Sequence, residues 1–83
     1  MKVIIYTTPA CAYCQMAKDF FERHKVAYEE KDVTVDEKAR DEMVKKSGQM
    51  GVPVVDIDGE IIVGFDEEKL SKILRHRKSL VRI

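Results

Sequence analysis

The pattern of hydrophobic positions along the chain predicts its first three elements, which are a strand, a helix and a second strand. Residues 2–7 are a continuous apolar, β-branched stretch, as expected of a strand buried on both faces. From residue 13 the apolar side chains recur at helical spacing, in a helix that should end near His24 or Lys25. They belong to Tyr13, Met16, Ala17, Phe20 and Phe21. Residues 26–33 indicate a short strand whose charges suit a sheet edge.

The middle of the chain predicts a helix followed by a β-hairpin. In "TVDE", Thr34 and Glu37 have the spacing of a capping box, and Gly48 is a suitable end for the helix. The segment "PVVDIDGEIIV" contains two strand-like runs separated by Asp58 and Gly59. This pair tolerates the positive φ angles of a type I′ turn, so we predict a two-residue hairpin.

A third helix is predicted after the hairpin, and the element order then defines a fold class. Asp66 can cap this helix, and Leu70, Ile73 and Leu74 share one of its faces. The order is βαβαββα, in which the first two strands are parallel and the hairpin adds antiparallel strands. We therefore predict an α/β, thioredoxin-like fold: a four-stranded mixed sheet with three helices, as a single domain over residues 1–83.

Composition and charge narrow the function classes. The chain of 83 residues is 45% hydrophobic and 36% charged, with a formal net charge of zero, which favours a soluble protein without affinity for nucleic acid. No apolar run approaches the roughly 20 residues that a membrane helix needs. The first residues do not resemble a secretory signal. We expect a cytoplasmic protein that acts as a monomer.

The chain has two cysteines, and both lie in "CAYC" at the predicted strand-to-helix junction. The N–H groups of a helix start favour a nearby anion, so Cys11 is expected to be the thiolate, and Cys14 lies one turn further on the same face. This predicts a reversible dithiol–disulfide pair, with Cys11 attacking a substrate disulfide and Cys14 resolving it. The alternative, two ordinary buried cysteines, is the weaker interpretation.

Zinc binding by the pair is disfavoured because half of a zinc site is missing. A structural zinc ion takes four ligands, and the chain contains no second cysteine pair. His24 and His76 lie outside any usual ligand spacing. We predict no metal site within one chain, although a cluster shared between two chains stays open.

Three motifs in order, "CAYC", "GVPVV" and "GFDEEKL", resemble the glutaredoxins, particularly the small glutaredoxin-like redoxins of bacteria and archaea. The resemblance runs from about residue 3 to residue 74. It implies a cis peptide bond between Val52 and Pro53, opposite Cys11, with the Val52 backbone pairing with the substrate. It also implies that Tyr13 flanks the thiol.

The same resemblance assigns a ligand role to the segment after the hairpin. Gly64, Phe65 and Asp66 match the residues that hold the γ-glutamyl end of glutathione in the family. For Asp66, this role and that of a helix cap are compatible. No bound cofactor is implied, and the partners would be proteins that contain a disulfide.

Three departures from the family pattern bear on the electron source. Ala12 replaces the usual Pro between the cysteines, Thr8 stands where many members have a Lys that binds glutathione, and Gln49 where some have Arg. Related redoxins accept electrons from thioredoxin reductase, and some pass them to ribonucleotide reductase. The sequence therefore leaves glutathione and thioredoxin reductase both open as reductants.

Two rival functions remain. Some glutaredoxins bridge an iron–sulfur cluster between two chains through the first cysteine, here Cys11, and two glutathione thiols, so this chain could be an iron–sulfur cluster carrier. The basic residues 75–82 could instead dock a partner in a protein without redox activity. We prefer to interpret this tail as a solvated helix end.

Overall fold

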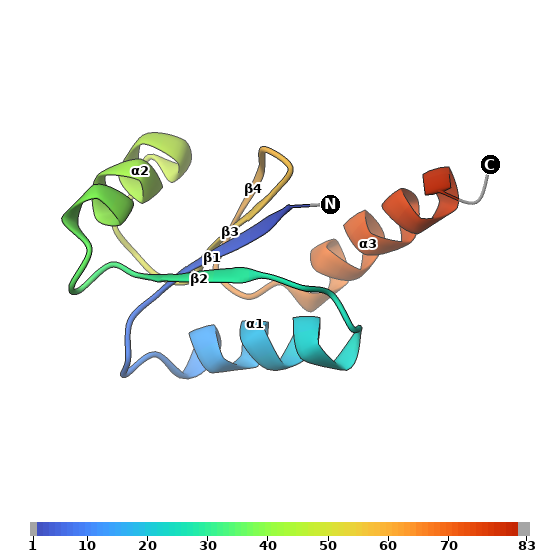
Figure 1. The fold of residues 1–83 in the computed structure, drawn as a ribbon, viewed down its shortest axis with the longest axis horizontal. Helices are drawn as coiled ribbons and strands as arrows, with labels where there is room; N and C mark the ends of the chain where they lie inside the picture. The colour runs from blue at the N-terminus through green and yellow to red at the C-terminus, as the bar shows by residue number, and fades with distance from the viewer. Residues whose placement is uncertain (1, 82–83) are drawn as a thin grey trace.

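A computed structural model describes residues 2–81 of the chain, and the side chains of residues 2–75. The elements in chain order are β1 (Val3–Thr7), α1 (Ala12–Arg23), β2 (Glu29–Asp32), α2 (Glu37–Ser47), β3 (Val54–Ile57), β4 (Glu60–Val63) and α3 (Glu67–Val81). The strands form one sheet in the order β2-β1-β3-β4, in which only β1 and β2 are parallel. This confirms the predicted α/β, thioredoxin-like fold (Figure 1).

The central strand β1 separates two hydrophobic layers, and all five of its residues are buried. Because side chains alternate along a strand, Val3 and Ile5 point to one face, and Ile4 and Tyr6 to the other. The first face packs against α1 and α3, and the second against α2; Figure 1 shows α1 and α2 on opposite sides of the sheet. The prediction that this strand is covered on both faces is confirmed.

The hairpin and the edge strand lie where the sequence predicts them, but the edge strand is shorter. Asp58 and Gly59 have φ angles of 51° and 93°, as a type I′ turn requires. The strand β2 lies at the sheet edge and covers Glu29–Asp32 rather than residues 26–33. The reason is that the N–H of Val26 donates to the carbonyl of Phe21 at 2.9 Å, in the turn that closes α1.

The predicted capping box of the second helix is wrong. The N-cap is Asp36, whose Oδ1 accepts the backbone N–H of Ala39 at 3.0 Å. Thr34 instead turns back, and its N–H and hydroxyl both donate to Asp32 Oδ1. A carboxylate caps a helix start at least as well as a threonine hydroxyl does, and its charge also interacts favourably with the helix dipole. The end of α2 at Gly48, with φ 74°, agrees with the prediction.

The buried face of α1 is rotated from the predicted apolar stripe. Its buried side chains are those of Cys14, Ala17, Phe20 and Phe21. Tyr13 and Met16, which the spacing assigned to the core, are 62% and 46% exposed. Cys14, Ala17 and Phe21 are separated by three and four residues and therefore share one face. When this face turns to the sheet, Tyr13 and Met16 are left at its margin.

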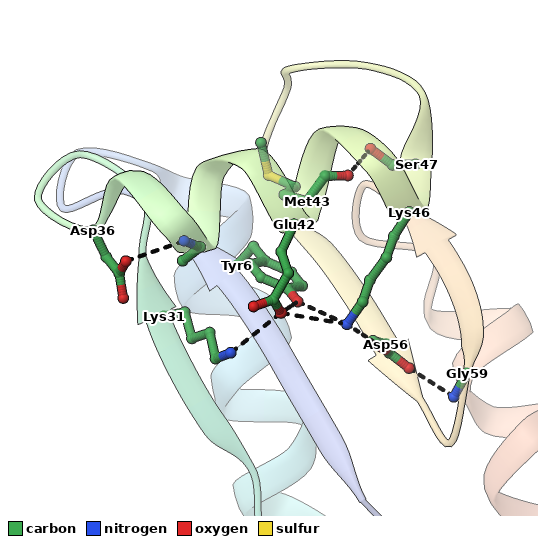
Figure 2. A network of polar contacts seen from close by, with 10 residues as sticks. Tyr6, Lys31, Asp36, Glu42, Met43, Lys46, Ser47, Asp56 and Gly59 are labelled. Carbon is green, nitrogen blue, oxygen red and sulfur yellow. Dashed lines mark hydrogen bonds and ion pairs between the residues drawn. The ribbon is translucent and has the colours of Figure 1, made fainter.

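A polar network connects α2 to the sheet, and Figure 2 shows it from close by. The fully buried Tyr6 donates its hydroxyl to Glu42 Oε1 at 2.7 Å and accepts from Lys46 Nζ at 2.8 Å. Lys46 also contacts Asp56 Oδ2 at 2.7 Å, and Lys31 contacts Glu42 Oε1 at 3.2 Å. Burial is the main reason that the pKa of Tyr6 is raised. The network joins α2 to three strands of the sheet.

One prediction concerns the basic tail of the chain. Beyond Arg75, the side chains of the basic tail lie outside the described residues, so the idea that it docks a partner stays a prediction.

Within residues 2–81, none of the helices combines the length and apolar character that a bilayer span requires.

Candidate functional site

Cys11 is the N-cap of α1, directly before the first helical residue. Its backbone is extended (φ −95°, ψ 112°), and its Sγ accepts the backbone N–H of Cys14 at 3.1 Å. A sulfur thus takes the place that a Ser, Thr, Asp or Asn oxygen usually holds at a helix start. The side chain is half-buried, and the first turn of α1 carries no acidic residue. A backbone N–H and the positive end of the helix dipole therefore face this sulfur.

Cys14 has the opposite environment. Its side chain is 1% exposed and belongs to the buried face of α1. Burial raises the pKa of Cys14 to about 12, and the hydrogen bond with Cys11 acts in the same direction. The backbone of Thr8 and the charge of Lys18 lower the pKa of Cys14 by smaller amounts. The two free thiols of the motif therefore differ in burial and in hydrogen bonding.

Strand register brings the three sequence motifs to one end of the sheet. Tyr6 near the end of β1 pairs with Val54 at the start of β3, and Val54 pairs with Val63 at the end of β4. The loop that carries Cys11, the loop before β3 and the loop after β4 therefore leave the sheet together. The Val52–Pro53 bond is cis, as the resemblance implied.

The predicted substrate residues lie on these loops and, in the case of Tyr13, in the first turn of α1, and their environments differ. Pro53 is buried, and its carbonyl accepts the N–H of Gly64 at 2.8 Å, which joins the last two loops. Val52 is half-buried against the α2 layer. Tyr13, adjacent to the buried Cys14, is mostly exposed.

The segment after β4 combines a glycine turn, an aromatic anchor and a helix cap. Gly64 has φ 79°, a conformation that favours glycine. Phe65 is half-buried, with its ring edge-on to Phe20 at a centroid distance of 6.1 Å. Asp66 is exposed, and its Oδ1 accepts the N–H of Lys69 at 3.1 Å. The predicted helix cap is therefore confirmed, and it uses one of the two carboxylate oxygens of Asp66.

Gln49 has a structural role in the loop before the cis bond. Its side-chain amide donates to the carbonyl of Gly51 at 3.0 Å and accepts the Gly51 N–H at 2.7 Å. Both polar ends of the side chain are thus used within its own loop. Thr8, another departure from the family pattern, accepts the backbone N–H of Cys11 with its carbonyl at 3.3 Å.

Sequence reasoning missed a charged pair beside Cys14. Lys18 lies one turn after Cys14 on α1, and its Nζ is 3.0 Å from Glu30 Oε2 on β2. The hydroxyl of Thr7 donates to the same oxygen at 2.8 Å. The spacing of Lys18 from Cys14 was a signal available in the sequence, whereas the pairing with Glu30 depends on strand register.

Metal ligands do not gather at this site or elsewhere in the part of the chain that the structure describes. No group of three or more His, Cys, Asp or Glu side chains there could hold an ion. His24 is exposed at the far end of α1, with its ring 4.3 Å from that of Phe20.

The fold and the cysteine site are those of a glutaredoxin-like redox protein, and comparison with known proteins agrees. The glutaredoxin family model matches residues 3–62. The glutaredoxin-like 8.6 kDa protein of the rubredoxin operon of Clostridium pasteurianum is 40% identical over 70 residues, which cover 84% of this chain and 93% of that protein. Glutaredoxin 3 of Escherichia coli K12 is 37% identical over 65 residues, 78% of each chain. The chain belongs to the glutaredoxin family.

A solved structure extends the comparison to a related redoxin. NrdH-redoxin from Escherichia coli, described as a glutaredoxin-like protein with a thioredoxin-like activity profile, has a TM-score of 0.77 and 25% identity. The match covers 87% of this chain and 93% of that protein. Proteins of this family work on disulfide substrates and take electrons from glutathione or a reductase.

Proposed function

We propose that this chain is a thiol–disulfide oxidoreductase in which Cys11 is the nucleophile and Cys14 the resolving thiol. The observation that carries the proposal is the difference between the two sulfurs. Cys11 Sγ is half-buried and accepts an N–H at a helix start, whereas Cys14 is 1% exposed with a pKa of about 12. Attack on a substrate disulfide requires an accessible sulfur, which Cys11 offers and Cys14 does not. Cys14 would react only after a mixed disulfide has formed at Cys11.

The proposed reaction moves two electrons to the substrate. The Cys11 thiolate attacks one sulfur of a substrate disulfide, the substrate S–S bond breaks, and the departing thiolate takes up a proton. Cys14 then loses its proton and attacks Cys11 Sγ, which releases the second substrate thiol. The chain is left with a Cys11–Cys14 disulfide, and a reductant returns two electrons and two protons to it.

The proposed substrate groove lies at the end of the sheet from which the three loops leave, after β1, before β3 and after β4. It would be lined by Tyr13, Val52, Pro53, Gly64, Phe65 and Asp66. Exposed Tyr13 offers an apolar wall beside the sulfurs. An extended substrate segment could pair with the backbone next to the cis bond, as a short antiparallel rung.

For the electron source we infer that a thioredoxin reductase fits better than glutathione. Thr8 carries no charge for a glycyl carboxylate, and both ends of the Gln49 amide are engaged with Gly51. The likeness to NrdH-redoxin supports this preference, while the likeness to glutaredoxin 3 supports the other donor. We place the cycle in the cytoplasm, where reductases keep such dithiols reduced. Ribonucleotide reductase is one protein disulfide to test.

The test is NADPH consumption with insulin as the disulfide substrate, in two arms. One arm contains glutathione and glutathione reductase, and the other contains thioredoxin reductase. We expect turnover chiefly in the second arm; turnover only with glutathione would reverse the choice of donor. A Cys11→Ser variant with full activity, or no turnover by the wild type in either arm, would contradict the assignment itself. Cys14→Ser should accumulate mixed disulfides visible by mass spectrometry.

A further inference from the structure

A lysine and a carboxylate are held together beside the resolving cysteine. Glu30 Oε2 accepts from Lys18 Nζ at 3.0 Å and from the hydroxyl of Thr7 at 2.8 Å. Thr7 is 1% exposed, at the end of β1 that leads to the cysteine motif. The side chains of Lys18 and Glu30 are 21% and 40% exposed, and their ion pair bridges the helix and the sheet at the surface. Three elements therefore fix the position of one cation.

The position of that cation relative to Cys14 follows from helix geometry. Residues four apart on a helix are neighbours, with Cβ atoms about 5–6 Å apart, so Lys18 extends from the same face as Cys14. On α1, Cys11 raises and Lys18 lowers the pKa of Cys14, and from the loop after β1 the backbone of Thr8 also lowers it. On β2, Glu30 faces Lys18.

Glu30 is suited to hold the lysine rather than to accept a proton. The Thr7 hydroxyl and the Lys18 ammonium hold the pKa of Glu30 below its usual range, although burial and nearby Asp32 act in the opposite direction. It is therefore a carboxylate at neutral pH and a weak base. The charge that can assist Cys14 is the one on Lys18.

Resting on the proposed function, we propose that Lys18, held by Glu30 and Thr7, is a positioning residue that stabilises the thiolate of Cys14 during the resolving step. In that step Cys14 Sγ gives its proton to solvent and attacks Cys11 Sγ. The bond between Cys11 and the substrate sulfur breaks, and the departing thiolate takes up a proton. Lys18 keeps its proton throughout and acts through its charge.

The experiment separates the two steps with Ellman's reagent, an aromatic disulfide whose released thiolate is yellow. Stopped-flow mixing of the reduced protein with the reagent should give a first release by Cys11 and a second release by Cys14. We expect Lys18→Met to slow the second release about three- to tenfold at pH 7, as the loss of one unit charge from the neighbouring turn in a partly hydrated site implies. The pH at which the second release reaches half of its maximal rate should also be higher in Lys18→Met than in the wild type.

Variants of the same lysine separate charge from packing. Lys18→Gln keeps a donor for Glu30 without the charge, and it should be as slow as Lys18→Met. Lys18→Arg keeps the charge and should restore the second release to within about twofold of the wild type. The matched control is Lys31→Met, because the pair Lys31–Glu42 has a similar distance, 3.2 Å, and similar exposure, on the opposite face of the sheet.

The possible results decide between the inference and the function on which it rests. Equal second-release rates and pH midpoints in the wild type, Lys18→Met and Lys18→Gln would overturn the role of Lys18. So would a failure of Lys18→Arg to restore the rate, or an equal slowing by Lys31→Met. A wild type that releases one thiolate only, or a second release that persists in Cys14→Ser, would instead refute the proposed dithiol cycle.

Discussion

Replacing Lys46 with methionine should destabilise the protein by about 2 kcal/mol. Lys46 Nζ lies 2.7 Å from Asp56 Oδ2 and 2.8 Å from the Tyr6 hydroxyl. The Asp56 side chain is 11% exposed, so the substitution leaves a nearly buried carboxylate without its cation. Breaking a buried pair in this way typically costs about 3–5 kcal/mol. We expect less here, because Lys46 is 29% exposed and Asp56 keeps the Gly59 N–H at 2.7 Å.

The loss can be measured by urea unfolding, followed by circular dichroism at neutral pH. A change of about 2 kcal/mol corresponds to a lowering of the melting temperature by roughly 8–16 °C in a chain of this size. The control is Lys72→Met, which breaks an exposed pair with Glu68 and should change stability by less than about 0.5 kcal/mol. Adding Asp56→Asn to Lys46→Met should recover part of the loss. A loss below about 0.5 kcal/mol, or no recovery, would refute the reasoning.

Two further predictions concern the titratable groups. Iodoacetamide at pH 7 should modify Cys11 at least about tenfold faster than Cys14, because the Cys14 side chain is buried and its pKa is about 12. Peptide mass spectrometry measures the ratio of the two modification rates, and equal rates would contradict this prediction. The Tyr6 hydroxyl and Lys31 lower the pKa of Glu42 below its ordinary 4.5. This group therefore stabilises the fold above pH 4.5 and less as the pH falls further, so the stability difference between wild type and Glu42→Gln should shrink from pH 6 to pH 3. A constant difference would contradict this assignment.

The sequence predicted the features that depend on local chemistry. Asp58 and Gly59 are adjacent, and their tolerance of positive φ is sufficient to define the hairpin. Cys11 and Cys14 are one turn apart. The position at which the helix begins therefore decides that Cys11 caps it and that Cys14 lies inside it. The order of elements then restricted the topology, because a crossover helix makes its two strands parallel.

Features that depend on competition or on strand register were harder to predict. Thr34 and Asp36 both suit a helix cap, and only the path of the chain shows that Asp36 is used. Tyr13 and Met16 fit the apolar spacing, yet α1 turns a face with Cys14 toward the sheet. The contact between Lys18 and Glu30 joins residues on separate elements, so no local pattern could indicate it.

The hydrogen bond from the Cys14 N–H to Cys11 Sγ also connects helix stability to electron affinity. A thiolate accepts this bond with a full negative charge, whereas the same sulfur in a disulfide is neutral and accepts it weakly. In the proposed cycle, oxidation of a Cys11 thiolate would therefore weaken the cap of α1. In a thermodynamic cycle, whatever stabilises the dithiol form of the folded chain relative to the disulfide form raises the reduction potential by the same free energy. In that cycle, the start of one helix would set part of the driving force with which the chain takes up electrons.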